Sequence, residues 1–122
     1  MLRLYGGRYD DPAYVERLGP CTELLWDVAV QIVAVGSSVV LDWNFWSRER
    51  RSEARQRAEA TGADLVVHWI DIPVEEVVER ALARAKPGPL HAHEIDAEGV
   101  RHLAAIFESP DHAEGFRLER HH

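Results

Sequence analysis

Two short apolar runs constrain the fold of this chain more than any other feature. One covers residues 39–41 and ends at Asp42, and the other covers residues 64–72. Strands buried on both faces of a parallel sheet show this pattern, because they do not alternate with polar residues. Residues 48–60, between the runs, have a helical composition. Two buried strands joined by a helix make a parallel, right-handed βαβ unit, which predicts an α/β fold.

Capping signals and helical periodicity predict four further helices, at residues 12–18, 22–35, 74–85 and 97–108. Gly19 is expected to end the first, and Gly36 the second. Ser47 and Gly62 are expected to cap the helix at 48–60, and Asp96 the last helix. The apolar positions expected to pack inward are Leu24, Leu25, Val28, Ile32 and Val35, then Val74, Val77, Val78, Ala81 and Leu82, and finally Val100, Leu103, Ala104 and Phe107.

Size and charge suit one small domain over residues 1–122, large enough to bury a core. The net charge of −7 argues against broad binding to nucleic acid or to an acidic membrane. Cys21 is the one cysteine, which excludes an intrachain disulfide and a cysteine-rich zinc site. No apolar run approaches the roughly 18 residues that span a bilayer, and no signal peptide is visible. A cytoplasmic protein is expected.

Asp42 and the arginines after it are the main candidates for a functional site. Asp42 ends the first apolar run, and open α/β sheets bind ligands outside the carboxyl ends of their strands. Arg48 and Arg51 follow on the first turn of the next helix, where they could bind phosphate. Alternatively, Asp42 only caps its loop by bonding amides near Asn44. Most other charges of this helix, on Arg50, Arg55 and Arg57, are expected to form a solvated face with local ion pairs.

The ordered segments VVLD, FWSRERRSEARQRAEATGA, HWIDIP and ERALAR, with RLYG and LLW upstream and FESPDHAEGF at the end, resemble a known family. They are similar to the second half of a P-loop kinase of the small AAA-like ATPase type, which includes zeta-toxin-like and polynucleotide-kinase-like enzymes. The resemblance implies a three-layer P-loop NTPase-like fold with a parallel sheet. It also implies a phosphotransferase that uses ATP and Mg²⁺.

In terms of residues, the resemblance implies catalytic roles for Asp42 and Arg48, with Asp42 holding Mg²⁺ through water. It implies phosphate or substrate binding by Arg48, Arg51, Arg80 and Arg84. The alternative for Arg80 and Arg84 is pairing with Glu76 and other neighbours. Asp71, at the end of the second apolar run, is a weaker candidate of the same kind as Asp42. The phosphate acceptor stays open among nucleosides, sugars, antibiotics, nucleic-acid ends and proteins.

The phosphate-binding motif G-x-x-x-x-G-K-[ST] is missing from the chain. Its one lysine, Lys86, lies between Ala85 and Pro87. The chain is therefore expected to lack the family's first strand, P-loop and first helix, and to be inactive alone. Two explanations stay open. The chain is part of a kinase-like enzyme, annotated or expressed from an internal start codon, or it is a non-catalytic paralogue that acts as a binding or assembly module. In the second, exposed strand edges could pair two copies into a homodimer.

Residues 86–93 are rich in proline and glycine and resemble a short or degraded lid. His91 and His93 within it could in principle bind zinc, but an H-x-H pair without cysteine partners favours solvent-exposed histidines.

Overall fold

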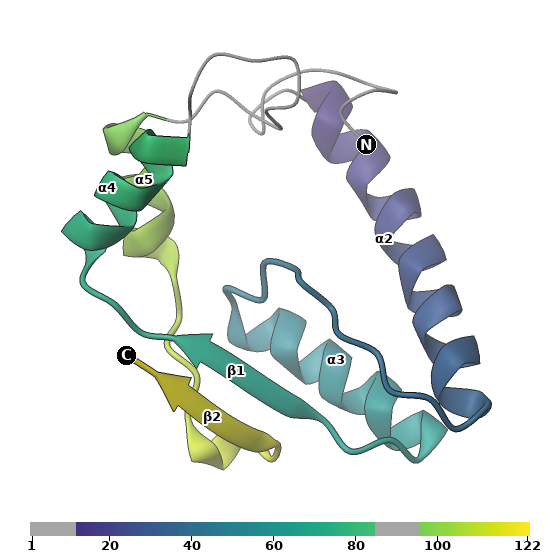
Figure 1. Cartoon of the computed structure of the whole chain (residues 1–122). Coiled ribbons are helices and arrows are strands. Elements are labelled where there is room, and N and C mark those ends of the chain that lie inside the picture. The colour runs from purple at the N-terminus through teal and green to yellow at the C-terminus, as the bar shows by residue number, and fades with distance from the viewer. Residues whose placement is uncertain (1–11, 85–95) are drawn as a thin grey trace.

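The computed structural model of the chain describes residues 12–84 and 96–122, which form helices and a small parallel sheet. Their order is α2 (Pro12–Ala34), α3 (Arg48–Thr61), β1 (Val66–Ile70), α4 (Val74–Arg84), α5 (Ala97–Ile106), the 3₁₀ helix η1 (His112–Glu114) and β2 (Arg117–His121). In Figure 1, α4 and α5 lie together beyond one end of the sheet, whereas α3 lies alongside it. The expected mixture of helices and parallel strands is confirmed. Within the described ranges, no helix is long and apolar enough to cross a bilayer.

The sheet joins β1 to β2, the segment furthest along the chain. The two strands run parallel, in a register from Val66 opposite Arg117 to Ile70 opposite His121. One further bond at each end, from the Asp71 amide to the His121 carbonyl (2.7 Å) and from the Arg117 amide to the Leu65 carbonyl (3.3 Å), lengthens the ladder. The second strand of the predicted βαβ unit, at residues 64–72, is present as β1. The first strand, at residues 39–41, is absent, so that part of the prediction is wrong.

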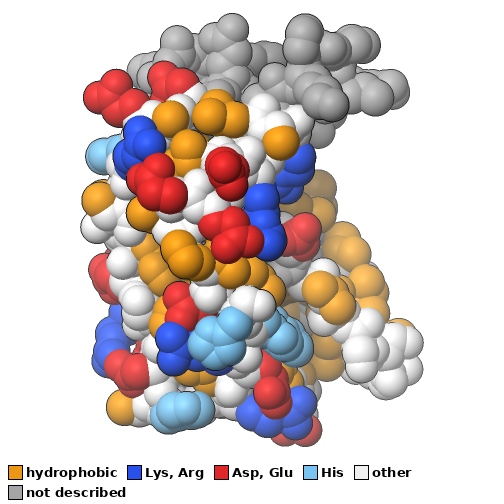
Figure 2. All heavy atoms as spheres, turned by 60° about the vertical axis from the view of Figure 1, so that its left-hand side comes forward, with side chains coloured by type: hydrophobic (Ala, Val, Ile, Leu, Met, Phe, Trp, Pro, Cys, Tyr) orange, Lys and Arg blue, Asp and Glu red, His pale blue; other side chains and the backbone are white. Residues whose placement is uncertain are grey.

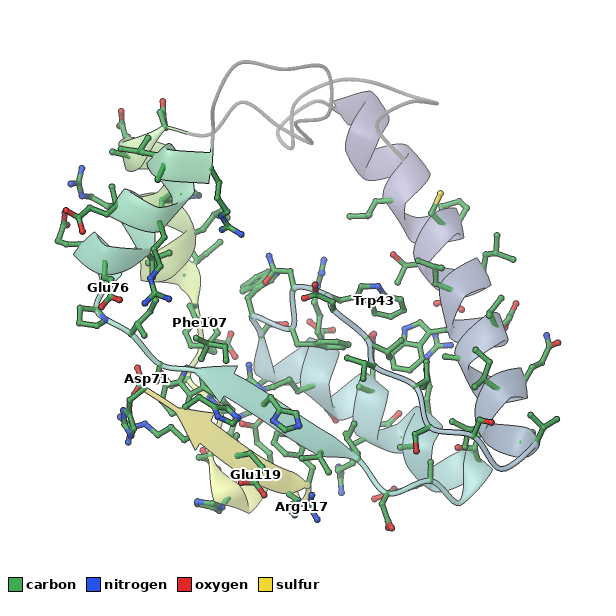
Figure 3. The ribbon with its side chains drawn as sticks, in the orientation of Figure 1. Trp43, Asp71, Glu76, Phe107, Arg117 and Glu119 are labelled. Carbon is green, nitrogen blue, oxygen red and sulfur yellow. The ribbon has the colours of Figure 1, made fainter. Side chains whose placement is uncertain are left out.

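Residues 37–42 form no strand, and the side chain of Val40 is 90% exposed. The aromatic residues that follow hold this segment against α2. Trp43 and Phe45 lie 5.1 and 6.4 Å, between ring centroids, from Trp26 of α2, and 5.8 Å from each other. Figure 3 shows Trp43 between this segment and α2. A strand needs a partner for its backbone groups, and β1 has β2 as its partner in the described structure.

Residues 12–34 form one helix of 23 residues, with Pro20 inside it, where the sequence predicted two. Gly19 does not adopt the positive φ of a helix stop, whereas Gly36 does, with φ 85°, just beyond the helix as predicted. Among the α2 side chains whose burial the structure describes, Trp26 and Ala29 are buried, and the guanidinium of Arg57 in α3 lies 4.9 Å from the centre of the Trp26 ring. The apolar stripe expected to pack inward is largely exposed, at 64% for Leu24, 49% for Leu25, 45% for Val28 and 80% for Val35.

Helix α3 begins and ends where its caps predict. The Ser47 hydroxyl accepts a hydrogen bond from the Arg50 amide, and Gly62 adopts φ 71° while its amide donates to the last carbonyls of the helix. Only Arg51 and Ala54 are buried along α3. The helix is thus positioned by a single buried arginine and its contacts rather than by an apolar stripe.

Helices α4 and α5 pack on each other around a small core. Val78 and Ala81 of α4 meet Val100 of α5, with Val77 and Ala97 at the margin. Asp96 caps α5 as predicted, since its carboxylate accepts from the Gly99 amide at 2.7 Å. Other predicted core residues lie outside this cluster, because only one face of each short helix meets the other: Leu82 is 46% exposed, Val74 38% and Phe107 37%, and Ala104 is exposed.

An exposed ion pair links α4 to α5. Arg101 of α5 donates from Nε and Nη2 to the two carboxylate oxygens of Glu75 in α4, at 3.0 and 2.8 Å. The hydrogen bond from Arg101 lowers the pKa of Glu75 below 4.5. A group whose pKa falls on folding stabilises the fold at a pH above its unfolded value.

We therefore expect Glu75→Gln to lower the melting temperature at about pH 7 and to match the wild type only at a pH below the lowered pKa of Glu75, where both chains lack the carboxylate charge. The difference should disappear as the pH falls below 4.5 and through the lowered pKa. Circular dichroism melts across this range would measure it. Glu79→Gln is the matched control on an exposed position of α4. An effect of Glu75→Gln that persists undiminished at about pH 3 would contradict the assignment.

Candidate functional site

The side chain of Arg51 is the most buried of the described chain, at 1% exposure, and all its nitrogens are hydrogen-bonded. Nε and Nη2 donate to the two carboxylate oxygens of Glu114, at 2.9 and 3.3 Å. Nη1 donates to the carbonyl of Phe45 at 2.9 Å. The Glu114 side chain is 4% exposed. A phosphate could reach this guanidinium only by displacing Glu114.

The N-terminus of α3 is also covered by acidic groups from near the end of the chain. A carboxylate oxygen of Glu108 accepts the Arg48 amide at 2.8 Å, and the Glu108 amide donates to the Trp46 carbonyl at 2.8 Å. The Arg48 guanidinium pairs with the Asp111 carboxylate. Anions are favoured at a helix N-terminus, where amides lack partners and the helix dipole is positive. Here protein carboxylates take that place.

The segment that carries these acids is held in shape by its own capping box. Asp111 caps η1 by accepting the Ala113 amide at 2.8 Å, and Glu114 reaches back to the Asp111 amide at 2.8 Å. Gly115 then turns the chain into β2 with φ 88°. A Cβ on Gly115 would lie 3.0 Å from Nη1 of Arg55, so the glycine leaves space for this side chain of α3. We call residues 108–115 the acidic segment.

The structure brings Arg48 and Arg51 together at the acidic segment, and leaves Asp42 apart from it. Asp42 is exposed, in the extended stretch before Trp43. No three His, Cys, Asp or Glu side chains converge as a metal site anywhere in residues 12–84 and 96–122. Mg²⁺ sites in phosphoryl-transfer proteins often use only one or two carboxylates together with substrate phosphates. Asp42 as a metal ligand therefore stays a prediction.

The remaining candidates lie near β1 and on α4. Asp71 follows β1 and pairs with Arg120 of β2, whose guanidinium also lies 4.9 Å from the centre of the Trp69 ring. Arg80 pairs with Glu76 one turn away, as the alternative interpretation expected. Arg84 is exposed in the last turn of α4. His91 and His93 lie outside the described residues. Phosphate binding by Arg48, Arg51, Arg80 and Arg84, and catalysis by Asp42 and Arg48, stay predictions.

Glu108, Asp111 and Glu114 were not predicted as the partners of the arginines. A signal was present: these acids recur every three residues, and Arg48 and Arg51 are also three apart. The acidic segment was noticed only through its resemblance to the family. Its physical role is to neutralise and position the first turn of α3.

Glu114→Ala should destabilise the fold by about 3–5 kcal/mol, because it leaves the Arg51 charge buried without its partner. Urea denaturation measures the change. The control, Glu76→Ala, removes the partner of an exposed arginine and should cost less than about 1 kcal/mol. Since Glu114 also caps η1, the double variant Arg51→Met, Glu114→Leu separates the two roles: it should recover part of the loss. Equal, small effects of Glu114→Ala and Glu76→Ala would refute the importance of the buried pair.

Comparison with known proteins gives one family. No curated protein matches the chain. A family model described as an AAA domain matches residues 1–110, which is most of the chain and includes all of α2 to α5. This match agrees with the order of segments that resembles a P-loop kinase. The chain therefore belongs to the AAA domain family, among its P-loop kinase-like members.

Proposed function

We propose that this chain contributes arginines to a P-loop kinase-like, nucleotide-binding site, and that the 122 residues by themselves bind Mg-ATP weakly and transfer no phosphoryl group. Family membership points to nucleotide binding. Phosphoryl transfer depends on positioning and on charge neutralisation by a phosphate-binding loop, its lysine and Mg²⁺. The 122 residues contain no such motif.

The occupied state of the arginines is the observation that carries this proposal. The Arg51 nitrogens, the Arg48 guanidinium and the Arg48 amide already contact protein oxygens. A bound phosphate would have to compete with carboxylates held in place by a capping box. Without a P-loop to hold the nucleotide, that competition favours the protein's own acids.

In the complete site, Arg48 and Arg84 would neutralise charge on the transferring group, Arg80 would act nearby, and Arg51 would hold α3 in place. Asp42 would hold Mg²⁺ through water, and the metal, bound also to phosphates of the nucleotide, would neutralise their charge. A three-layer P-loop NTPase-like fold, with helices on both faces of a parallel sheet, would then require further strands beside β1. The phosphate acceptor could still be a small molecule or a nucleic-acid end.

The test is calorimetric and thermal-shift titration of the purified chain with Mg-ATP. A ligand that binds only the folded state adds about 2.7 kcal/mol of stability at 100 times its Kd, so a site would raise the melting temperature visibly. We expect no rise up to about 1 mM and no ADP formation with any acceptor tried. A Kd below about 10 µM, lost in Asp42→Ala and kept in the exposed control Ser38→Ala, would overturn the proposal.

A second candidate function, as an assembly module, is favoured by the exposed apolar side chains of α2 and residues 35–42. Val40, Val35 and Leu24 are 90%, 80% and 64% exposed. The occupant we consider is a second copy of this chain, because pairing of two such surfaces would bury the apolar side chains of both. The net charge of −7 per chain opposes this pairing, so the apolar contact must outweigh it.

Light scattering at tens of micromolar protein would decide this candidate. A homodimer that uses Val40 should dissociate in Val40→Asp, because a carboxylate would be buried at the interface. Ser38→Asp adds the same charge at an exposed position two residues away and should stay dimeric. A monomeric wild type excludes the assembly module in its homodimer form.

A further inference from the structure

Two histidines meet on the exposed face of the sheet. His68 lies in β1 and His121 in β2, and both are exposed. Nδ1 of His68 lies 3.0 Å from Nε2 of His121, and the rings stack at 24° with centroids 5.3 Å apart. Figure 2 shows histidine side chains gathered on one face among acidic and basic ones. The parallel register creates this contact, because it sets His68 opposite Glu119 and His121 two residues further on.

The two facing nitrogens can share only one proton. One imidazole donates its N–H, and the other accepts this hydrogen bond through its lone pair. One of the two facing nitrogens is therefore protonated and the other is not. When a divalent transition metal binds between these nitrogens, that proton moves to the other nitrogen of its own ring, and the metal accepts the lone pairs of both facing nitrogens. With metal–nitrogen distances of about 2.0–2.1 Å and tetrahedral angles, the two nitrogens would lie about 3.3 Å apart. Exposed side chains can open by these few tenths of an ångström.

We propose that His68 and His121 form a binding site for a divalent transition metal such as Zn²⁺, in which the metal links β1 to β2. Imidazole nitrogens are preferred ligands for zinc, nickel and copper, whereas Mg²⁺ prefers oxygen. With its nitrogen ligands, this site is thus chemically distinct from the oxygen-ligand Mg²⁺ site of the kinase-like family.

Water completes the coordination. Glu119, opposite His68, is the acidic side chain of the register that could add a third ligand, but its carboxylate pairs with Arg117 at 3.3 Å. Figure 3 shows both residues on β2. Nearby, Asp71 is engaged by Arg120. A site with two protein ligands is weaker than a structural zinc site with four, so its metal exchanges readily.

Bound metal would fasten the end of the chain onto the sheet. A sheet of two strands is at best marginally stable by itself. The metal binds a geometry that exists only when β1 and β2 are paired, so it should stabilise the folded state in proportion to its concentration.

Titration of the full chain with ZnCl₂ in a calorimeter tests the proposal. We expect one bound Zn²⁺ per chain, and a loss of affinity of about tenfold or more in His68→Ala and in His121→Ala, which corresponds to at least ~1.4 kcal/mol. Both positions are exposed, so both variants should fold, and circular dichroism checks this. Ring-nitrogen chemical shifts of the two histidines should move together on adding Zn²⁺.

Two controls separate this site from other histidines. His122→Ala removes the neighbour of His121, and the double variant His91→Ala, His93→Ala removes the H-x-H pair; both should keep the wild-type affinity. No Zn²⁺ binding by the wild type up to about 1 mM would overturn the proposal. So would full affinity in His68→Ala, or binding abolished by the double variant.

Discussion

The buried ion pair between Arg51 and Glu114 is the contact on which the arrangement of this chain depends. It joins α3 to the acidic segment, two parts of the chain that lie 63 residues apart. A buried arginine loses much hydration, and three hydrogen bonds to oxygen acceptors compensate for that loss here. Because the apolar core is small, this polar contact fixes the position of α3, and the acidic segment leads directly into β2.

Local signals predicted the helices well, and long-range partners poorly. Ser47, Gly62 and Asp96 cap their helices through bonds to residues a few positions away, so short stretches of sequence suffice to find them. The run at residues 39–41 has the composition of a strand, but a strand exists only if another lies beside it. Residues 117–121 read RLERH, with no apolar alternation, and pair because of their position beside β1. Composition could not reveal either outcome.

The candidate site divides in the same way. Arg48 and Arg51, on the first turn of α3, both contact the acidic segment. These partners could not be predicted, because the acids come from 60 and 63 residues further along the chain. Carboxylates and phosphates offer arginine similar oxygen geometry, so a cluster of arginines has the same sequence pattern whether it binds a ligand or the protein's own acids.

The parallel pairing of β1 with β2 also affects when this protein can fold. Helices and caps form from neighbouring residues while a chain is being made. The sheet, by contrast, joins Val66–Ile70 to Arg117–His121, so its contacts span about fifty residues. During synthesis β1 leaves the ribosome well before its partner strand, with its backbone groups unpaired. Such an exposed strand is a template for contacts with other chains. Until residues 117–121 emerge, β1 is therefore open to pairing with other chains.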